Sequence, residues 1–186
     1  FVGHIRLEAQ RLVTLIGDII RLSQLDEGGD MPHENVDLLS VASAVADDLL
    51  PSADGQGISI AVEGSPANVY GVKRLLYEIV YNLCDNAIKY NRQGGSVKIS
   101  TVSEGGFSTV TVSDTGIGIA PEYQNRIFER FFRVDKSHSK AIGGTGLGLS
   151  IVKHGVTFLG GTLKMVSEIG KGTEITMTFP KERKVV

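Results

Sequence analysis

The chain is organised around the stretch Glu78-Ile-Val-Tyr-Asn-Leu-Cys-Asp-Asn-Ala-Ile-Lys-Tyr90. Apolar residues around it repeat at helical spacing and predict one buried helix face. They are Leu75, Leu76, Ile79, Val80, Leu83 and Ala87. A second row on the same helix is polar and consists of Glu78, Asn82, Asn86 and Lys89. Because asparagine is a mediocre helix former, this row indicates groups that bind a metal ion and phosphates, with a solvated polar face as the open alternative.

The composition is that of an ordinary globular protein, with 186 residues, 41% of them hydrophobic and 22% charged. A net charge of −2 provides neither a basic footprint for nucleic acid nor a polybasic membrane patch. The single cysteine, Cys84, excludes an internal disulfide and fits a reducing compartment. No apolar run approaches the roughly 20 residues of a membrane helix. Because the sequence starts inside an apparent helix, we expect it to be a fragment of a longer protein.

Residues 1–27 carry a heptad-like apolar stripe that predicts a long amphipathic helix ending at Gly28-Gly29. The stripe consists of Ile5, Leu12 and Ile19 in one series and Val2, Ala9 and Ile16 in another, widened by Leu15, Leu22 and Leu25. The charged residues of the helix, among them Asp18 and Arg21, lie largely outside this stripe. A helix of this kind needs a partner for its stripe. The pattern favours a helix bundle or dimer seam over packing on the chain's own domain.

The rest of the chain alternates between helical and strand patterns after a linker at residues 28–36. We expect a helix from Leu38 that ends at Pro51, a strand at 58–62, the central helix at 71–91, and a hairpin made of 97–102 and 107–113. A short helix at 121–130, another through about Phe158, and a last hairpin made of 163–167 and 173–179 complete the order.

Two glycine-rich segments lie in the second half of the chain. The first, Asp114-Thr-Gly-Ile-Gly-Ile119, follows a strand and brings the backbone close to a ligand. An aspartic protease would need a second Asp-Thr-Gly copy, which only a homodimer could supply. The second, Gly143-Gly-Thr-Gly-Leu-Gly-Leu-Ser150, precedes a helix and predicts an anion site. Its spacing matches neither the Walker nor the dinucleotide pattern.

Four segments in this order resemble the asparagine, first glycine, phenylalanine and second glycine boxes of the sensor histidine kinases of two-component systems. They are Asn82-Leu-Cys-Asp-Asn-Ala-Ile-Lys-Tyr90, Asp114-Thr-Gly-Ile-Gly-Ile119, Phe128-Glu-Arg-Phe-Phe-Arg-Val-Asp135 and Gly143-Gly-Thr-Gly-Leu-Gly-Leu-Ser150. The resemblance covers roughly residues 35 to 180. It implies an α/β fold of Bergerat type, a two-layer sandwich of mixed β-sheet and helices that is shared with gyrase-type ATPases and heat-shock chaperones.

The resemblance also divides the chain and predicts its partners. Residues 1–28, with Leu22-Ser-Gln-Leu25, resemble the second helix of the family's dimerisation hairpin, and 29–186 would form the ATP-binding catalytic domain. A homodimer through the intact hairpin and a response regulator receiver domain are the expected partners. The expected location is the cytoplasmic portion of a membrane-anchored sensor.

By resemblance, each box has a role in binding ATP and Mg²⁺. Asp114 would accept a hydrogen bond from the adenine amino group, Thr173 would support this contact through water, and Tyr90 would lie by the ribose or base. The first glycine box, with Gly116, Ile117, Gly118 and Ile119, would form the near edge of the lid. Asn82 and Asn86 would hold Mg²⁺, and Lys89 would contact phosphate. The backbone amides of Thr145, Gly146, Leu147, Gly148 and Leu149 would wrap the phosphates, and Arg133 would stabilise charge on the γ-phosphoryl group.

The sequence departs from the family at the phosphoacceptor. No His-Glu-Leu-Arg-Thr-Pro-Leu-like segment is present, and His4 matches the second hairpin helix instead. His33, His138 and His154 are expected to be ordinary residues. The γ-phosphoryl group would therefore pass to a histidine upstream of this fragment and then to a response regulator aspartate. We expect the fragment alone to be inactive in autophosphorylation.

Two alternatives stay open. The chain could be a nucleotide-sensing or dimerisation module without kinase activity. It could also be an ATPase of the gyrase or chaperone kind in which Glu78, four residues before Asn82, is the general base. For Glu78, a metal-orienting or solvated carboxylate is favoured over a base.

Overall fold

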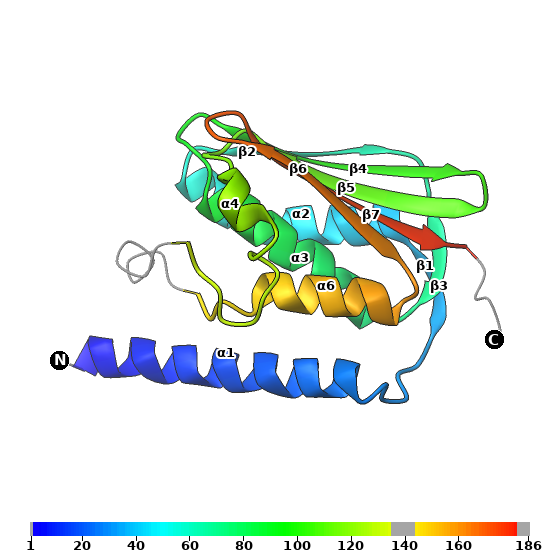
Figure 1. Cartoon of the computed structure of the whole chain (residues 1–186). Coiled ribbons are helices and arrows are strands. Elements are labelled where there is room, and N and C mark those ends of the chain that lie inside the picture. The colour runs from blue at the N-terminus through cyan, green and yellow to red at the C-terminus, as the bar shows by residue number, and fades with distance from the viewer. Residues whose placement is uncertain (1, 135–143, 182–186) are drawn as a thin grey trace.

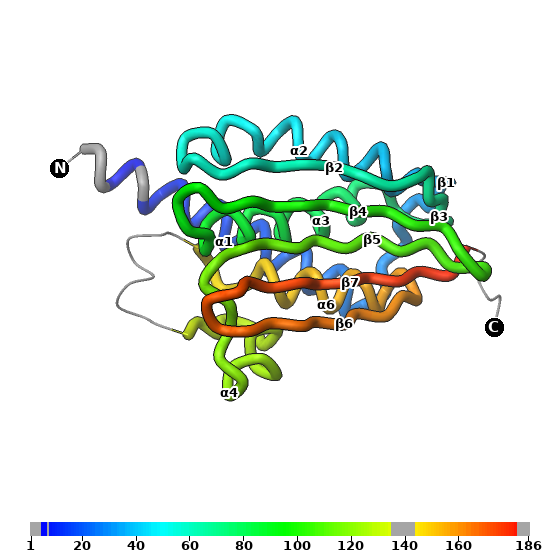
Figure 2. Tube along the Cα trace, turned by 90° about the horizontal axis from the view of Figure 1, so that it is seen from above, coloured from blue at the N-terminus to red at the C-terminus, as the bar shows by residue number. Residues whose placement is uncertain are grey.

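The computed structural model describes residues 2–134 and 144–181 and contains a mixed five-stranded sheet in the order β2-β4-β5-β7-β6. The strands are β2 (Ser59–Gly64), β4 (Ser96–Glu104), β5 (Phe107–Asp114), β6 (Thr162–Glu168) and β7 (Gly172–Pro180). Strand β2 runs parallel to β4, and the other neighbours are antiparallel. Figure 2 shows the strands side by side, with β4 and β5 forming the expected hairpin and β6 and β7 the last one.

Helices cover one face of this sheet, as Figure 1 shows. They are α2 (Leu38–Gly55), α3 (Lys73–Lys89) and α6 (Gly148–Phe158). The alternating buried residues of β4, β5 and β7 share one core with the apolar face of α3, which is buried at each of the positions expected from its spacing. The two-layer α/β sandwich predicted from the sequence is therefore confirmed.

A small second sheet lies at one end of the molecule and was not predicted. It pairs β1 (Glu34–Asp37) with β3 (Asn68–Gly71) in antiparallel register. Asp37 ends β1 and caps α2, because its carboxylate accepts hydrogen bonds from the backbone N–H groups of Leu39 and Ser40. It also accepts one from Ala67 N at 2.9 Å. The end of the expected linker at 28–36 is thus part of an ordered strand.

The expectation that Pro51 ends the second helix is wrong. Helix α2 continues through it to Gly55. Proline lacks the N–H that would bond to the preceding turn, yet Leu49 and Ala53, on either side of it, are both buried. Burial of these apolar side chains continues the packed face past the proline and offsets the missing bond.

The long helix α1 (Val2–Asp26) lies outside the three-helix layer, beneath α6 in Figure 1. It packs on the domain through Leu22 and Leu25, which are buried, and Leu15, which is partly buried. Other apolar residues of the predicted stripe stay exposed, namely Ile5, Leu12, Ile16 and Ile19. Part of the stripe therefore packs on the chain's own domain, which the sequence pattern did not favour. The bundle or dimer seam stays a prediction for the exposed side. None of the described helices combines the length and apolarity needed to cross a membrane.

The segment after the first glycine box contains one short helix, α4 (Pro121–Gln124), followed by turns rather than the helix to Arg130 that the sequence predicted. Figure 2 places α4 beyond the β6 edge of the sheet. The polar stretch at 136–141, with His138, lies outside the described residues, as do Asp135 and Gly143 at the ends of their boxes.

Candidate functional site

Helix α3 supplies one wall of the candidate site. Its row of Glu78, Asn82, Asn86 and Lys89 is only partly buried, in contrast to the opposite face. Asn82 lies directly against the start of α6, because a Cβ atom added to Gly148 would be 3.2 Å from Asn82 Oδ1. The asparagine row and the second glycine box, about 65 residues apart in the sequence, therefore meet across the α3–α6 contact.

Asp114 ends β5 with its carboxylate held by two backbone groups. Its Oδ1 accepts hydrogen bonds from Gly116 N at 2.7 Å and from Thr173 N at 3.3 Å. Burial raises the pKa of the Asp114 carboxyl group, and these two hydrogen bonds act in the opposite direction. Within the described residues nothing donates to Oδ2, which leaves this oxygen to accept from a ligand. Asp114 and Thr173 are thus brought together, and the support that Thr173 would give to the adenine contact through water stays a prediction.

The first glycine box is packed between α3 and the β6–β7 hairpin. Ile117 N donates to Tyr90 O at 3.1 Å, and a Cβ at Gly116 would lie 2.5 Å from the same oxygen. Gly118 has φ 69°, and a Cβ there would lie 2.0 Å from Glu168 O. Only glycine fits at these two positions. Ile119 N donates to Ser167 Oγ at 2.9 Å, which ties the far end of the box to β6.

The phenylalanine box and the second glycine box also face each other. Phe131 N donates to Gly146 O at 3.0 Å, and Arg133 Nη1 donates to Gly144 O at 2.7 Å. Phe131 has φ 62°, an unusual value for a residue that is not glycine. Leu147 is fully buried and packs with Leu22 of α1. The Arg133 side chain is therefore held beside the loop that was expected to wrap phosphates.

Helix α1 contacts this region through three charged side chains. Thr145 Oγ1 donates to Asp18 Oδ2 at 2.6 Å, and Arg21 Nε lies 2.9 Å from Glu78 Oε2 in an ion pair. Asp26 pairs with Arg130 and His154. Burial raises the pKa of Asp18 against the hydrogen bond from Thr145. Burial also raises the pKa of Glu78, and the positive charges of Arg21 and Arg74 oppose this shift.

Comparison with known proteins agrees with this arrangement. Residues 71–183, more than half of the chain, match the family described as "Histidine kinase-, DNA gyrase B-, and HSP90-like ATPase". The chain belongs to this family. Its place among the sensor histidine kinases follows from individual relatives. The sensor-like histidine kinase SenX3 of Mycolicibacterium smegmatis is 41% identical over 97% of this chain. The match spans 48% of SenX3, so the chain corresponds to about half of that relative.

Solved structures of histidine kinases share the fold. The mycobacterial sensor histidine kinase MprB is 31% identical with a TM-score of 0.70, and the match covers 80% of this chain and 97% of that one. Full-length ShkA, solved in complex with AMPPNP, is 30% identical with a TM-score of 0.83, over 96% of this chain and 38% of that one. The chain is the ATP-binding catalytic region of a sensor histidine kinase, as the four boxes predicted.

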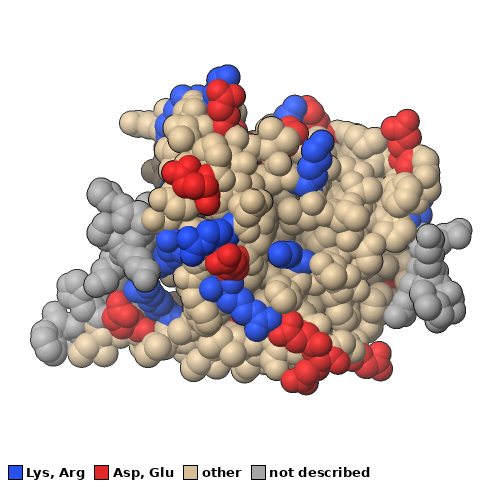
Figure 3. All heavy atoms as spheres, in the orientation of Figure 1, with Lys and Arg blue, Asp and Glu red and all other residues tan. Residues whose placement is uncertain are grey.

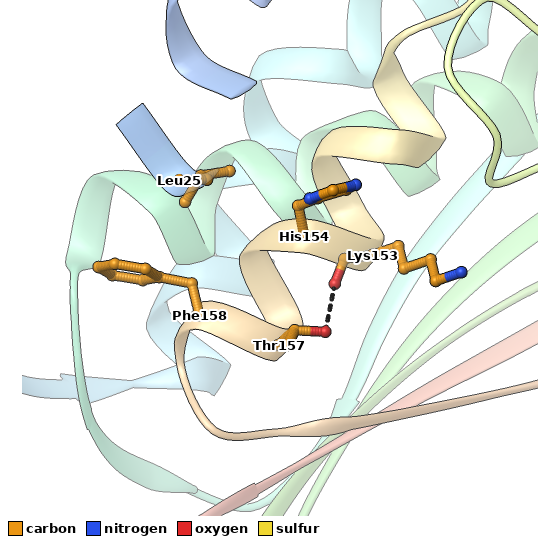
Figure 4. A pocket seen from close by; sticks show the side chains of 5 residues that line it. All are labelled: Leu25, Lys153, His154, Thr157 and Phe158. Atoms are coloured by element: carbon orange, nitrogen blue, oxygen red, sulfur yellow. Dashed lines mark hydrogen bonds between the residues drawn. The ribbon is translucent and has the colours of Figure 1, made fainter. Parts of the chain in front are cut away.

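Two cavities of about 240 Å³ lie beside α1 in this histidine kinase region. Figure 4 shows the first, between α1 and α6, with Leu25 facing the side chains of α6. The second lies between α1 and α3 and is lined by Arg21, Arg74, Tyr77, Glu78 and Tyr81. Neither is lined by Asn82, Asn86 or Asp114. The expected nucleotide contacts are therefore distinct from both cavities.

The amide oxygens of the asparagine row are suitable ligands for Mg²⁺. No group of three or more His, Cys, Asp or Glu side chains among the described residues could hold a metal ion. Mg²⁺ takes oxygen ligands and commonly keeps waters and substrate phosphates, so one or two protein oxygens suffice. The amide oxygens of Asn82 and Asn86 fit this requirement. Lys89 is at present paired with Asp85, one turn earlier on α3, and would have to turn to reach a phosphate.

The contacts of Asp18 and Arg21 were missed by sequence reasoning, which placed both residues outside the apolar stripe. A signal was available, because Asp18 lies four residues before the buried Leu22, and Arg21 four before the buried Leu25. Residues at that spacing share a helix face. Figure 3 shows basic and acidic side chains next to one another on the face that carries α1 and α6. Charges of both signs on one face allow ion pairs to form between these helices.

The Arg21–Glu78 ion pair makes the docking of α1 testable. Changing Arg21 to methionine keeps most of the side-chain volume but leaves Glu78 without its nearest cation. Because only 15% of the Arg21 side chain and 27% of the Glu78 side chain are exposed, we expect a loss of about 2 kcal/mol of docking free energy, or about 30-fold faster amide hydrogen exchange in α1. The control is Arg11→Met, since the Arg11–Glu8 pair is exposed and long at 3.8 Å. Equal exchange rates in the two variants would show that the pair does not hold α1.

Proposed function

We propose that this region binds ATP with Mg²⁺ and donates the γ-phosphoryl group to a histidine outside the chain, for onward transfer to a response regulator aspartate. The main support for this proposal is the Asp114 carboxylate. Its Oδ1 accepts hydrogen bonds from Gly116 N and Thr173 N, and its Oδ2 can accept one from a ligand. An ionised carboxylate at this position suits an amino group of a base. The complex of ShkA with AMPPNP, an ATP analogue, supports the same ligand class for this chain.

The remaining residues are assigned around that contact. Asn82 and Asn86 would hold Mg²⁺, whose charge would offset that of the phosphates. Lys89 would contact phosphate and Tyr90 would lie by the ribose or base. The amides of residues 145–149 would surround the phosphates, since N–H groups at the start of a helix attract anions. Leu147 N now donates to Thr145 Oγ1 at 3.3 Å and would have to exchange this partner for a phosphate oxygen. Arg133, next to Gly144, would stabilise charge on the γ-phosphoryl group. Phosphoryl transfer depends mainly on such positioning and charge neutralisation.

Glu78 is assigned to orienting its neighbours rather than to activating water. Its carboxylate is engaged by Arg21 and lies between α1 and α3. A general base must be within reach of the water that it deprotonates. The pairing with Arg21 gives a reason to favour the kinase over the gyrase-type ATPase.

The whole protein would be a dimeric, membrane-anchored sensor with this region in the cytoplasm. Residues 1–28 would belong to the dimerisation hairpin and 29–186 to the catalytic domain. The exposed apolar residues of α1 include Ile5, Leu12, Ile16 and Ile19, at successive spacings of seven, four and three residues, which fits a helical partner along one side. The histidine acceptor would lie on that partner segment, outside this chain.

Nucleotide titration tests the proposal. We expect calorimetry to show AMPPNP binding at one site, with tighter binding when Mg²⁺ is present. A longer protein that carries a His-Glu-x-x-Thr-Pro-like segment should form acid-labile phosphohistidine from ATP, whereas residues 1–186 alone should not. Absence of AMPPNP binding would contradict the nucleotide site. Binding without phosphohistidine in the longer protein would instead favour a nucleotide-sensing module.

A further inference from the structure

Asn91 follows the asparagine box, and its side-chain amide is fully engaged. Its Nδ2 donates to Ala87 O at 3.0 Å and to Ser96 O at 3.1 Å. Its Oδ1 accepts from Arg92 N at 3.0 Å and, more weakly, from Thr115 Oγ1 at 3.4 Å. A primary amide has two N–H donors and an oxygen with two lone pairs, so all four capacities are used. Because two carbonyl oxygens lie on one side, the amide has only one favourable orientation.

These bonds join three parts of the fold. Ala87 O belongs to the last turn of α3, where carbonyl groups lack partners within the helix. Ser96 begins β4, and Thr115 directly follows Asp114 at the end of β5. Ser96 and Thr115 are also bonded to each other, through Thr115 N to Ser96 O at 3.1 Å and Ser96 N to Thr115 Oγ1 at 2.9 Å. Asn91 therefore holds the residue next to Asp114 against the end of α3.

The same junction places the Tyr90 carbonyl against the first glycine box. Ile117 N donates to that carbonyl oxygen. A Cβ at Gly116 would lie 2.5 Å from Tyr90 O and 2.8 Å from Asp114 Oδ1, so the three groups are in close contact. Interiors packed this closely transmit small displacements. A shift of Asn91 would consequently move the backbone that orients the Asp114 carboxylate.

We propose that Asn91 is a positioning residue for base recognition, which holds the Asp114–Ile117 segment so that the Asp114 carboxylate meets the amino group of adenine. The inference rests on the nucleotide-binding function proposed above. Asn91 acts through Asp114 and Tyr90 and needs no contact with the nucleotide. Adenine presents an amino donor where guanine presents a carbonyl acceptor, so a correctly held carboxylate favours adenine and repels guanine. Loss of the positioning should reduce this discrimination.

The test compares ADP and GDP binding to wild type and to Asn91→Asp by calorimetry. Aspartate has the same shape but sets an oxygen against the carbonyl groups of Ala87 and Ser96. We expect the dissociation constant for ADP to rise about tenfold while that for GDP stays unchanged, so that the preference for ADP falls about tenfold. Asn125→Asp, at the exposed end of α4, is the matched control and should keep the wild-type preference.

A second variant displaces the Asn91 side-chain amide by a substitution at a neighbouring residue. Gly95→Ala would place a Cβ 2.1 Å from Asn91 Oδ1 and 2.8 Å from the backbone oxygen of Arg92, and would push the Asn91 amide aside without changing Asn91 itself. It should reduce the preference for ADP as well, and it decides the question if Asn91→Asp fails to show cooperative thermal unfolding. An unchanged preference in the folded variants, including equal weakening of ADP and GDP, would overturn the positioning role. A wild type that binds ADP no better than GDP would overturn the nucleotide proposal itself.

Discussion

Replacing Asp114 with asparagine is expected to weaken ADP binding by about 100-fold, or roughly 3 kcal/mol. In asparagine, the retained oxygen can still accept from Gly116 N and Thr173 N. The group that replaces Oδ2 is then an NH₂, which sets a donor against the donor amino group of adenine. Calorimetric titration of wild type and variant with ADP measures the effect. The control is Asp47→Asn, on the exposed side of α2, for which we expect wild-type affinity.

The same variant should not lose stability, and this separates a binding effect from unfolding. Burial raises the pKa of Asp114 above its ordinary value of 3.8. A raised pKa in the folded state contributes stability that is present below the ordinary value and is lost as the pH rises through the folded value. At pH 7 the ionised carboxylate therefore lowers the free energy of unfolding, and the neutral asparagine avoids this cost. A lower melting temperature of Asp114→Asn at pH 7 would contradict this interpretation.

Replacing Asn82 with alanine is expected to weaken ATP binding in the presence of Mg²⁺ by about 10- to 100-fold. This loss is most of the gain in affinity that Mg²⁺ provides. Alanine has no oxygen ligand for the metal, and it leaves a gap beside Gly148. Titrations with the ATP analogue AMPPNP in the presence and absence of Mg²⁺ measure the difference. Without Mg²⁺ we expect wild type and Asn82→Ala to bind alike, because only the metal-dependent part is lost.

Two further variants make the assignment specific. Asn82→Asp keeps an oxygen at the same place, and we expect it to retain the response to Mg²⁺. Asn125→Ala removes an exposed asparagine at the end of α4 and should behave as wild type. If Asn82→Ala keeps the full Mg²⁺ response, Asn82 is not a metal ligand. The metal would then depend on Asn86 and the phosphates alone.

Much of the fold could be predicted because its signals are local. The apolar spacing of α3 follows helical periodicity, and the alternation at 97–102 and 107–113 follows the period of a strand, so both faces can be assigned without knowing the partner element. Glycines of the first box lie where a Cβ atom would collide with the backbone of another segment, as at Gly116 and Gly118. The order of the four boxes was sufficient to predict the family that the comparisons then showed.

Features that depend on contacts between distant residues could not be predicted. Helix α2 passes Pro51 because Ala53, beyond it, is buried in the core. Strand β1 exists because it pairs with β3, about 30 residues later. The junction at Asn91 joins residues from three elements, and nothing in the local sequence distinguishes this asparagine from an exposed one.

The sequence alone therefore establishes the family, the two-layer sandwich and the polar row of α3, since each rests on spacing within a short segment. Only the tertiary structure decides what the row and the long N-terminal helix contact. It directs Asp18 and Arg21 toward Thr145 and Glu78 and leaves Ile5, Leu12, Ile16 and Ile19 exposed. The physical reason is that an amphipathic pattern specifies which residues share a face but not which surface that face meets.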